Sequence, residues 1–595
     1  MKRIECDLLV AGSGAGGLST AVTARKAGLD VIVAEKAAVF GGTTAFSGGV
    51  LWIPGNAHCP AAKSDTREAA RQYLMQETGA NFDAAAVDAF LDNAPKAAEW
   101  FERETSVAFV PTLYPDYHPQ VPGGVDIGRS VLARPFDIRG LGDDMKRLRP
   151  PLKTITFIGM MFNSSNADLK HFFNATRSLT SFLYVARRLA THIKELAVYR
   201  RGINVTSGNA LAARLAKSVL DAGVPIWTSS PVQRLIVEQG VVKGAVVRRD
   251  GQDVQVIARH GVVLACGGFP HDLDKIGKAY PHLRQGGEHL SPVPTDNTGD
   301  GIRIGESVGA QFEIRFPSTS AWMPVSRVPY SDGSFGVFPH LLDRYKPGII
   351  GVTRKGVRFC NEADSYHDVG AAMIRACAGE RETAMWLVCD QKALSKYGLG
   401  FVKPAPMPIG RFLRNGYLVK GRTLAELANN CGIDAAALER TVAQYNEGAV
   451  HGEDRQFGRG TTSFNRYLAD PENQPNPCVA PVSKGPFYAV KVIMGDLGTF
   501  DGLRTTPQGQ VLSTRGAAIP GLYAVGNDRA SMMGGNYPGA GITLGPNLTF
   551  GWITGNFIAR QAREAREGHE GHEGHQGQQG GLPAGPKAQA AHAVA

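Results

Sequence analysis

The chain has 595 residues, of which 43% are hydrophobic and 20% are charged, so it is long enough for two or more globular domains and is not disordered by composition. The net charge of +10 comes without a nucleic-acid-binding motif, and we expect no nucleic-acid partner. The eight cysteines form no CxxC pair, which argues against a disulfide framework and against a zinc site, and we expect no metal.

Neither a signal peptide nor a membrane-spanning segment is expected. The first seven residues are a charged lead into a strand, and no stretch reaches the roughly 18 apolar residues of a spanning helix. We therefore expect a cytoplasmic protein, with a peripheral position on the inner face of the cell membrane as an open alternative.

The N-terminal segment predicts a βαβ unit with a dinucleotide site. An apolar run (DLLVA) precedes the turn GSGAGG, and a helical segment of small residues leads to a second strand, DVIVAEK. Gly12 permits the tight turn, Gly14 lets a pyrophosphate approach the backbone, and Gly17 lets helix and strand pack closely. Glu35, at the end of the second strand, is placed to accept the ribose hydroxyls.

Further glycine-rich loops follow along the chain. Gly41-Gly42-Thr43 and Ser47-Gly48-Gly49 come soon after Glu35, where they suit a cofactor that extends past the first helix with a flavin ring near backbone amides. Two later strand-like runs also end in glycines, 261–265 (GVVLA) before Cys266-Gly267 and 521–525 (GLYAV) before Gly526-Asn527. These strands predict one discontinuous nucleotide-binding domain.

Residues 145–202 combine apolar clusters with the bases Arg187, Arg188, Lys194, Arg200 and Arg201. One interpretation is an ordinary helical hairpin packed on the domain. The other is an element that places apolar side chains in a membrane interface while the bases meet lipid head groups. Residues 566–595 form a low-complexity tail, which we expect to be disordered, although its histidines could bind a metal.

The glycine-rich segments resemble the flavoprotein family that includes fumarate reductases and 3-ketosteroid dehydrogenases. The resemblance runs from about residue 5 to about residue 565, outside 145–202, and it implies FAD as the cofactor. The residues expected to contact FAD are Gly12, Gly14, Gly17, Glu35, Lys36, Gly41, Gly42, Thr43, Ser47, Gly48, Gly49, Ala265, Gly267, Gly526, Asn527 and Leu544.

The implied fold is α/β, with a discontinuous Rossmann-like FAD-binding domain and an inserted α+β catalytic domain that covers the substrate. We expect the first part of the FAD-binding domain at 1–322, the catalytic domain at 323–495 and the second part of the FAD-binding domain at 496–565.

The segment Tyr537-Pro-Gly-Ala-Gly541 resembles the signature of the 3-ketosteroid Δ1-dehydrogenases, and the loop has no arginine to neutralise a dicarboxylate such as fumarate. Tyr117 follows an aspartate as in a family segment of Phe-Pro-Asp-Tyr type. Tyr366 ends a segment similar to Asn-Glu-Ser-x-Pro-Tyr, although Ser365 replaces the proline and Asp364 adds a charge. A phenylalanine that lines the steroid pocket in some members has no clear match, and Leu342 and Phe338 are both candidates.

The resemblance implies 1,2-dehydrogenation of a 3-ketosteroid. Tyr537 and the amide of Gly541 would polarise the C3 carbonyl, and Tyr366 would remove the C2 proton once its pKa is lowered, with Tyr117 in its hydrogen-bond network. The C1 hydride would pass to N5 of FAD. Because residues 145–202 suit a membrane-loaded substrate, we expect a bulky 3-ketosteroid such as cholest-4-en-3-one.

Other functions stay open. A flavin dehydrogenase or ene-reductase of a smaller cyclic ketone would use the same enolate chemistry. A fumarate- or urocanate-type reductase, or a flavin-binding carrier without catalysis, is a further alternative. The electron acceptor is not specified by the sequence, and a quinone or a soluble carrier would each suit a chain without iron–sulfur or haem motifs.

Overall fold

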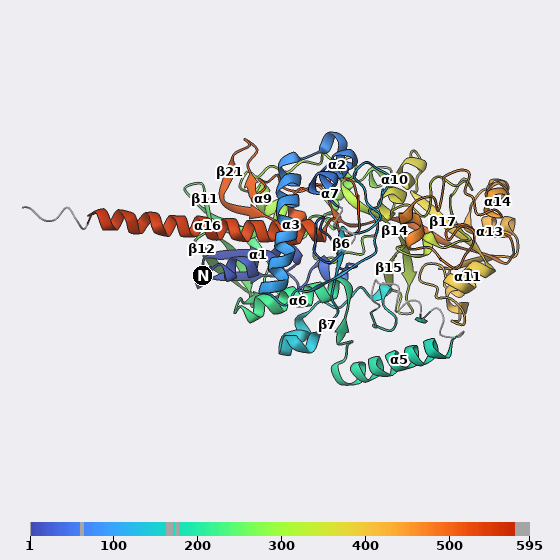
Figure 1. Ribbon diagram of the computed structural model, residues 1–595, viewed down its shortest axis with the longest axis horizontal. Coiled ribbons are helices and arrows are strands. Elements are labelled where there is room, and N and C mark those ends of the chain that lie inside the picture. Colours follow the sequence, from blue (N-terminus) through green and yellow to red (C-terminus); the bar gives the residue numbers. More distant parts are fainter. Residues whose placement is uncertain (1, 60–64, 162–170, 173–177, 577–595) are drawn as a thin grey trace, which may run out of the picture.

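The computed structural model describes residues 2–59, 65–161, 171–172 and 178–576. Figure 1 shows an elongated molecule in which the nucleotide-binding part and the catalytic part lie at opposite ends. The long C-terminal helix extends from the nucleotide-binding end, and helix α5 (Leu179–Tyr199) lies below the body.

The central sheet of the nucleotide-binding part has six strands in the order β20-β21-β13-β2-β3-β9. All neighbouring pairs are parallel except the edge pair β20-β21. The interior strands are continuous apolar runs because both faces of the sheet are covered, one by helix α1 (Ala15–Lys26) and the other by strands β11 (Val241–Arg249) and β12 (Gln252–Ala258) of a second sheet. The bounds are β2 (Leu8–Ala11), β3 (Val31–Ala34), β9 (Ile226–Trp227), β13 (Val262–Leu264), β20 (Gln510–Leu512) and β21 (Ala518–Ala524). Strands from both ends of the chain share this sheet, so the expected discontinuous Rossmann-like fold is confirmed.

Helices α1 (Ala15–Lys26) and α16 (Leu544–Gln576) pack tightly beside this sheet. The contact needs small residues, because a Cβ on Gly551 would lie 1.9 Å from Ser19 Oγ and one on Gly555 would lie 2.9 Å from Thr23 Cβ. The small-residue segment after the glycine-rich turn is therefore explained by close helix packing. The other helices of this part are α2 (Arg67–Thr78), α3 (Ala84–Glu104), α6 (Ser207–Asp221), α7 (Leu273–Ala279), α8 (Pro281–Arg284) and α9 (Asp300–Glu306).

Three smaller sheets complete the nucleotide-binding part. The charged lead at the N-terminus is itself a strand, β1, which pairs in parallel with β12. The four-stranded sheet is β1 (Lys2–Cys6), β12 (Gln252–Ala258), β11 (Val241–Arg249) and β10 (Val232–Glu238). The other two are β4 (Val50–Trp52), β6 (Ser130–Ala133) and β5 (Phe109–Pro111), and the pair β7 (Phe136–Asp137) and β8 (Asn204–Val205).

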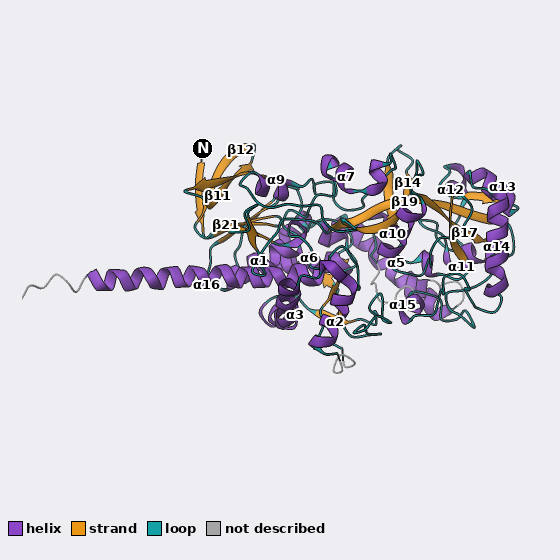
Figure 2. Cartoon of the chain, turned by 90° about the horizontal axis from the view of Figure 1, so that it is seen from above, coloured by secondary structure: helices purple, strands orange, loops and turns teal. Residues whose placement is uncertain are grey.

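The catalytic part is built on a second six-stranded sheet, which is antiparallel throughout and lies at the far end of the molecule in Figure 2. Its path is β15-β14-β19-β17-β16, with β18 also on β19. The strands are β14 (Ser320–Pro329), β15 (Phe335–Pro339), β16 (Ile349–Thr353), β17 (Ala384–Asp390), β18 (Val419–Gly421) and β19 (Phe487–Thr499). The helices are α10 (Tyr366–Ala376), α11 (Gln391–Tyr397), α12 (Gly410–Arg414), α13 (Leu424–Cys431), α14 (Ala435–Ala449) and α15 (Ser463–Tyr467). The expected domain boundaries at 322/323 and 495/496 fall inside β14 and β19. The division into these domains stays a prediction.

Short 3-10 helices complete the described secondary structure: η1 (Thr43–Phe46), η3 (Gly79–Asn81), η4 (Ile138–Arg147), η5 (Lys153–Ile155), η6 (Asp343–Tyr345) and η7 (Gly526–Asp528). Helix α16 continues to Gln576, so the first residues of the expected disordered tail are helical, and 577–595 lie outside the described residues. In the part of the chain that the structure describes, no helix is long and apolar enough to cross a membrane.

Candidate active site

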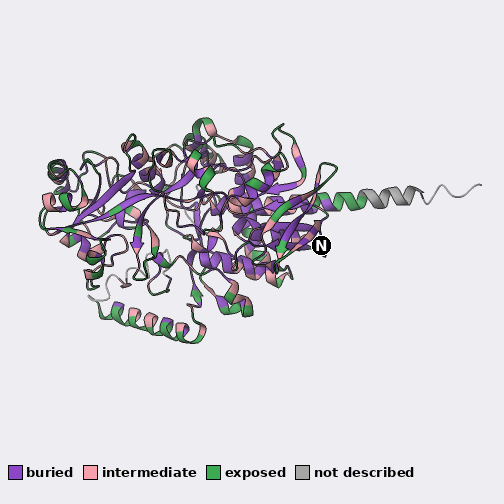
Figure 3. Cartoon of the chain, turned by 180° about the vertical axis from the view of Figure 1, so that it is seen from behind, coloured by how far each residue is buried: buried purple, intermediate pink, exposed green. Residues whose placement is uncertain are grey.

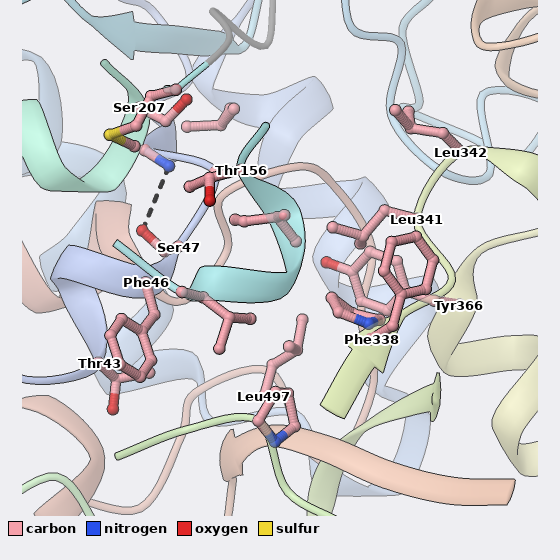
Figure 4. A pocket seen from close by; sticks show the side chains of 18 of the residues that line it. Thr43, Phe46, Ser47, Thr156, Ser207, Phe338, Leu341, Leu342, Tyr366 and Leu497 are labelled. Carbon is pink, nitrogen blue, oxygen red and sulfur yellow. Dashed lines mark hydrogen bonds between the residues drawn. The ribbon is translucent and has the colours of Figure 1, made fainter. Parts of the chain in front are cut away.

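A cavity of about 1660 Å³ runs from the glycine-rich turn to the catalytic sheet. Figure 4 shows Phe338, Leu341 and Tyr366 on one side of it and Thr43, Phe46 and Ser47 on the other. Of the expected site residues, those that line the cavity are Gly12, Gly14, Glu35, Lys36, Gly42, Thr43, Ser47, Gly48, Gly49, Tyr117, Ala265, Gly267, Tyr366, Gly526, Asn527, Tyr537, Gly541 and Leu544. Gly17 and Gly41 do not line it.

The three glycines of the turn differ in the space around them. Gly12 has φ +111°, and a Cβ there would lie 2.1 Å from the carbonyl oxygen of Ala265. A Cβ on Gly17 would lie 2.1 Å from the oxygen of Gly12, so this glycine serves helix–strand packing rather than ligand contact. A Cβ on Gly14 would meet nothing closer than Thr44 Oγ1 at 3.8 Å, on the side that faces the cavity. This open space at the start of α1 fits a pyrophosphate.

The carboxylate of Glu35 lines the same end of the cavity and is held in place from two sides. It accepts hydrogen bonds from the backbone and hydroxyl of Ser13 and from the backbone N–H of Ala37 at 2.8 Å. Lys36 also lines the cavity, but its ammonium donates to Asp300 at 2.7 Å. The channel therefore combines the Glu35 carboxylate, which can accept ribose hydroxyls, with glycine backbone that a pyrophosphate can approach. These are the groups that binding of FAD requires.

Three buried tyrosines from distant segments meet at the other end of the channel. The hydroxyl of Tyr117 donates to that of Tyr366 across 3.4 Å. The ring of Tyr537 stacks on Tyr117 with centroids 5.6 Å apart and meets Tyr366 edge-on at 5.0 Å. The residues expected to share a site are therefore brought together.

Hydrogen bonds between backbones fix two of these tyrosines. The backbone N–H of Tyr117 donates to the carbonyl of Pro538 at 2.8 Å, and the hydroxyl of Tyr73 donates to the same oxygen at 2.6 Å. The preceding Asp116 accepts from the indole of Trp52 and from the buried guanidinium of Arg129. The loops that carry Tyr117 and Tyr537 thus form one unit.

Gly541 follows in the same loop and has φ +91°. A Cβ there would lie 2.4 Å from the carbonyl oxygen of Val50, so only glycine fits. Within the described residues its N–H has no hydrogen-bond acceptor, although its carbonyl accepts from Trp52 N–H at 3.1 Å. An unpaired N–H beside the hydroxyl-bearing ring of Tyr537, on the wall of one cavity, suits an oxyanion site.

Burial sets the acid–base state of the tyrosines. It raises the pKa of Tyr366 and of Tyr117 well above the ordinary value. The neighbouring phenols add to this rise for Tyr366, whereas for Tyr117 the hydrogen bond with Tyr366 opposes it. Burial also raises the pKa of Tyr537, against hydrogen bonds with Tyr366 and Thr543 that lower it. The expectation of a lowered pKa for Tyr366 is therefore wrong, and all three hydroxyls are protonated at neutral pH.

A histidine that the motifs did not single out joins the two parts of the site. His118 follows Tyr117, and its ring nitrogens lie 2.9 Å from carboxylate oxygens of Glu77 and Asp368. Burial opposes protonation of His118, but the hydrogen bonds to Asp368 and Glu77 outweigh it and raise its pKa to about 11. We call this ion-paired set of Glu77, His118 and Asp368 the His118 bridge.

The departure from the Asn-Glu-Ser-x-Pro-Tyr pattern belongs to this bridge. Ser365 caps α10 by accepting from the backbone N–H of Asp368 at 3.1 Å, and its hydroxyl donates to the Asp368 carboxylate at 2.5 Å. Asp364, the added charge, accepts from Asn465 at 3.1 Å. A serine in place of proline therefore positions the carboxylate that receives His118.

Several residues of the cavity were not identified, or not assigned a role, from the sequence motifs. Phe464 packs on Tyr117 at 4.4 Å, and Tyr345 lies edge-on to Phe464. Phe338 and Leu342, the two candidates for the missing phenylalanine, both line the cavity. Because these residues lie in segments far apart in the sequence, only the fold brings them together.

Comparison with known proteins agrees with this geometry. The family described as FAD binding domain matches residues 7–544. The chain is 44% identical to a 4-oxocyclohex-2-ene-1-carboxylate 5-dehydrogenase of Sinomonas cyclohexanicum, over 94% of this chain and 95% of the relative. It is 35% identical to a 3-oxosteroid 1-dehydrogenase of Mycolicibacterium smegmatis, over 94% of this chain and 98% of the relative.

A solved structure is similar over the same length. The 3-ketosteroid Δ1-dehydrogenase from Sterolibacterium denitrificans, in complex with 1,4-androstadiene-3,17-dione, superposes with a TM-score of 0.85. It is 35% identical to this chain and the match covers 94% of this chain and all of the other. The expected cofactor, FAD, is thereby confirmed.

The His118 bridge gives a first prediction, on stability. Because the folded pKa of His118 is raised from 6.5 to about 11, the bridge contributes stability that is fully present below pH 6.5 and is lost as pH rises through about 11. We expect His118→Gln to lower the melting temperature near neutral pH and the difference from wild type to shrink toward pH 11. Thermal unfolding at a series of pH values measures this.

The exposed His451, for which a change to Gln should leave the melting temperature unchanged at every pH, is the matched control. A deficit of His118→Gln that stays constant across the pH range would contradict the ionic character of the bridge.

Proposed function

Because the chain belongs to the FAD binding domain family, we propose that it converts a 3-oxo-4-ene steroid into the 1,4-diene. The protein is an FAD-dependent oxidoreductase, and the general reaction that its relatives support is dehydrogenation of a steroid or other cyclic ketone. One observation carries the finer proposal. Tyr117, Tyr366 and Tyr537 meet in the cavity that the glycine-rich turn lines, beside the Gly541 N–H, which has no acceptor among the described residues.

Two groups of this site are suited to hold the ketone oxygen. The hydroxyl of Tyr537 and the N–H of Gly541 would both donate to the C3 oxygen, which develops negative charge as the C2 proton leaves. Because burial keeps the Tyr537 hydroxyl protonated, it is available as a donor at neutral pH. The low dielectric of a buried site strengthens both hydrogen bonds.

Tyr366 is proposed as the base that takes the C2 proton. The Tyr117 hydroxyl lies 3.4 Å from the Tyr366 oxygen and, as a donor to a tyrosinate formed there, would stabilise its negative charge. The bound FAD supplies the acceptor for the C1 hydride. The His118 bridge holds α10, and with it Tyr366, against the loop of Tyr117.

The cavity supports a substrate with several rings. Beyond the tyrosines the cavity is bounded by apolar side chains of α5 and by Pro404, Pro406 and Met407, which lie in a loop of the catalytic part. We therefore retain a bulky 3-ketosteroid, such as cholest-4-en-3-one, as the proposed substrate. A second candidate is a small cyclic keto acid, which is favoured by the 44% identity to a dehydrogenase of that kind.

Anaerobic titration of the purified flavoprotein with a panel of ketones tests the proposed reaction. We expect cholest-4-en-3-one and androst-4-ene-3,17-dione to bleach the yellow flavin absorbance, with preference for the first because the cavity extends beyond the tyrosines. Cyclohexanone serves as the minimal ketone. Reduction by cyclohexanone but by neither steroid would contradict the steroid reaction, and preference for the smaller steroid would contradict a sterol substrate.

Tyr366→Phe tests the assignment of the base. Loss of one positioned acid–base group lowers a rate by roughly 10²- to 10⁴-fold, and we expect flavin reduction to slow by that factor while FAD stays bound. Stopped-flow absorbance measures the rate, and Tyr114→Phe is the matched control because Tyr114 lines the same cavity outside the three-tyrosine cluster. Near-normal reduction in Tyr366→Phe would remove Tyr366 from its proposed role.

We also propose that α5 contacts a membrane surface. Figure 3 shows this helix apart from the body with much of its surface exposed. Leu179, Leu183 and Ile193 are 74%, 58% and 65% exposed, at spacings that place them along one face. The bases Arg187 and Lys194 are exposed on the same helix, while Val185 and Leu189 line the cavity. Such a helix suits peripheral binding to anionic lipid at the mouth of the cavity.

Replacement of Leu183 and Ile193 by Glu tests this contact. We expect the double variant to keep its melting temperature, because both side chains are exposed, and to lose co-sedimentation with vesicles that contain anionic lipid. Leu273→Glu, at a residue that is 78% exposed on α7, controls for the added charge. Equal sedimentation of the double variant and wild type would contradict the proposal.

A further inference from the structure

The cations that line the cavity differ in how their charge is satisfied. Three form ion pairs and two donate to backbone carbonyls: Lys36 to Asp300, Arg149 to Asp296, Lys396 to Asp470, Lys346 to Leu468 and Ala469, and Arg466 to Gly460. Lys392 is exposed to solvent. Lys403 is half-buried, and within the described residues it has neither an ion pair nor a hydrogen bond.

Aromatic rings hold the ammonium group of Lys403 in place. Its Nζ lies 5.3 Å from the ring centre of Phe401 and 6.0 Å from that of Phe338. Asp343 is the acid that acts on it at longer range, but the Asp343 carboxylate already accepts from His340 at 2.7 Å and from the backbone N–H of Gly400 at 2.9 Å. Burial lowers the pKa of Lys403, as expected for a cation without a close counter-charge.

A partly desolvated cation that has no ion pair or hydrogen bond among the described residues is costly, and an anion that enters the cavity would offset this cost. Lys403 lines the same cavity as Tyr366, and the ring of Phe338, 6.0 Å from the Lys403 ammonium, lies on the same side of the cavity as Tyr366 in Figure 4. We propose that Lys403 binds the carboxylate of those cyclic ketone substrates that carry one, a role it would not have for a neutral steroid such as cholest-4-en-3-one. This inference rests on the proposed function, because it takes the ketone to be bound at Tyr537 and Gly541.

Two-point binding would fix the substrate in the cavity. With the ketone oxygen at one end and the carboxylate at Lys403, the ring between them has one orientation relative to Tyr366, which is the condition for efficient proton removal. The carboxylate has two chemical sources, a short acid on a single ring and the side-chain acid of a steroid. Both place an anion at Lys403, and they differ in the distance from ketone to carboxylate.

Acid and ester pairs test the proposal on the holoenzyme. The probes are 4-oxocyclohexanecarboxylate and 3-oxochol-4-en-24-oate, each with its methyl ester, in steady-state turnover with an artificial electron acceptor. We expect wild type to prefer at least one acid over its ester. Lys403→Met should raise KM for that acid roughly 10- to 100-fold, the value of a charge-assisted hydrogen bond, with little change in kcat or in the ester's KM.

Lys403→Arg should restore part of the acid preference, and Lys392→Met should behave as wild type, because Lys392 lines the cavity but is exposed. Preference for the cyclohexane acid identifies the short source, and preference for the steroid acid identifies the long one. Equal KM values for acid and ester in wild type, or an acid preference that survives Lys403→Met, would overturn the proposal.

Calorimetric binding of the unreactive cyclohexanecarboxylate and cholanoate separates this inference from the reaction itself. Binding of one of these acids that is lost in Lys403→Met supports the carboxylate site even if none of the ketones is oxidised, an outcome that would count against the proposed reaction alone. Turnover of neutral steroids together with no Lys403-dependent binding of either acid would keep the reaction and reject the carboxylate site.

Discussion

The hydrogen bond between the hydroxyls of Tyr117 and Tyr366 is the contact on which the site depends. These tyrosines come from opposite parts of the molecule, one from a loop of the nucleotide-binding part and the other from the first turn of α10 in the catalytic part. Their hydroxyls meet only if the two parts are fixed relative to each other. The His118 bridge provides a charged link at this point, because each of its carboxylates comes from a different part.

Burial of the tyrosines has two opposite consequences for a dehydrogenase. It keeps the Tyr537 hydroxyl protonated, which suits a hydrogen-bond donor to a ketone, but it also makes ionisation of Tyr366 unfavourable. The proposed base therefore needs a donor that stabilises its anion, a role that the adjacent Tyr117 hydroxyl can fill. The same low dielectric that raises these pKa values makes each hydrogen bond to a developing enolate stronger.

Much of the fold and of the site could be predicted because local chemistry marks it. The turn at Gly12, Gly14 and Gly17 has a steric requirement at each glycine, and it lies between a buried strand and a helix that are both evident in the sequence. The Tyr-Pro-Gly segment likewise carries its own backbone constraint at Gly541. These features are set by neighbouring residues, so a short motif specifies them.

The features that were missed depend on tertiary contacts. His118 and Asp368 are 250 residues apart, and no motif links them. The sequence also does not reveal that Lys403 lacks an ion pair or hydrogen bond among the residues that the structure describes, because it is one of several lysines near aromatic residues. The pKa of Tyr366 was expected to fall because its role was considered without its burial. Helix α16 continues to Gln576, beyond the point where the composition becomes low in complexity.

Buried ion pairs hold the loop that precedes Tyr366 in place. Glu362, four residues before Tyr366, accepts from Arg358 at 2.7 Å and lies 3.3 Å from Arg459, and both guanidinium groups are fully buried. Arg344 donates to the backbone carbonyl of Glu362 at 2.6 Å. Breaking one partner of such a network leaves a buried charge unpaired, so the loop has little freedom. The loss of conformational entropy that positions Tyr366 therefore occurs on folding. The binding energy of the substrate can then serve to orient the ketone.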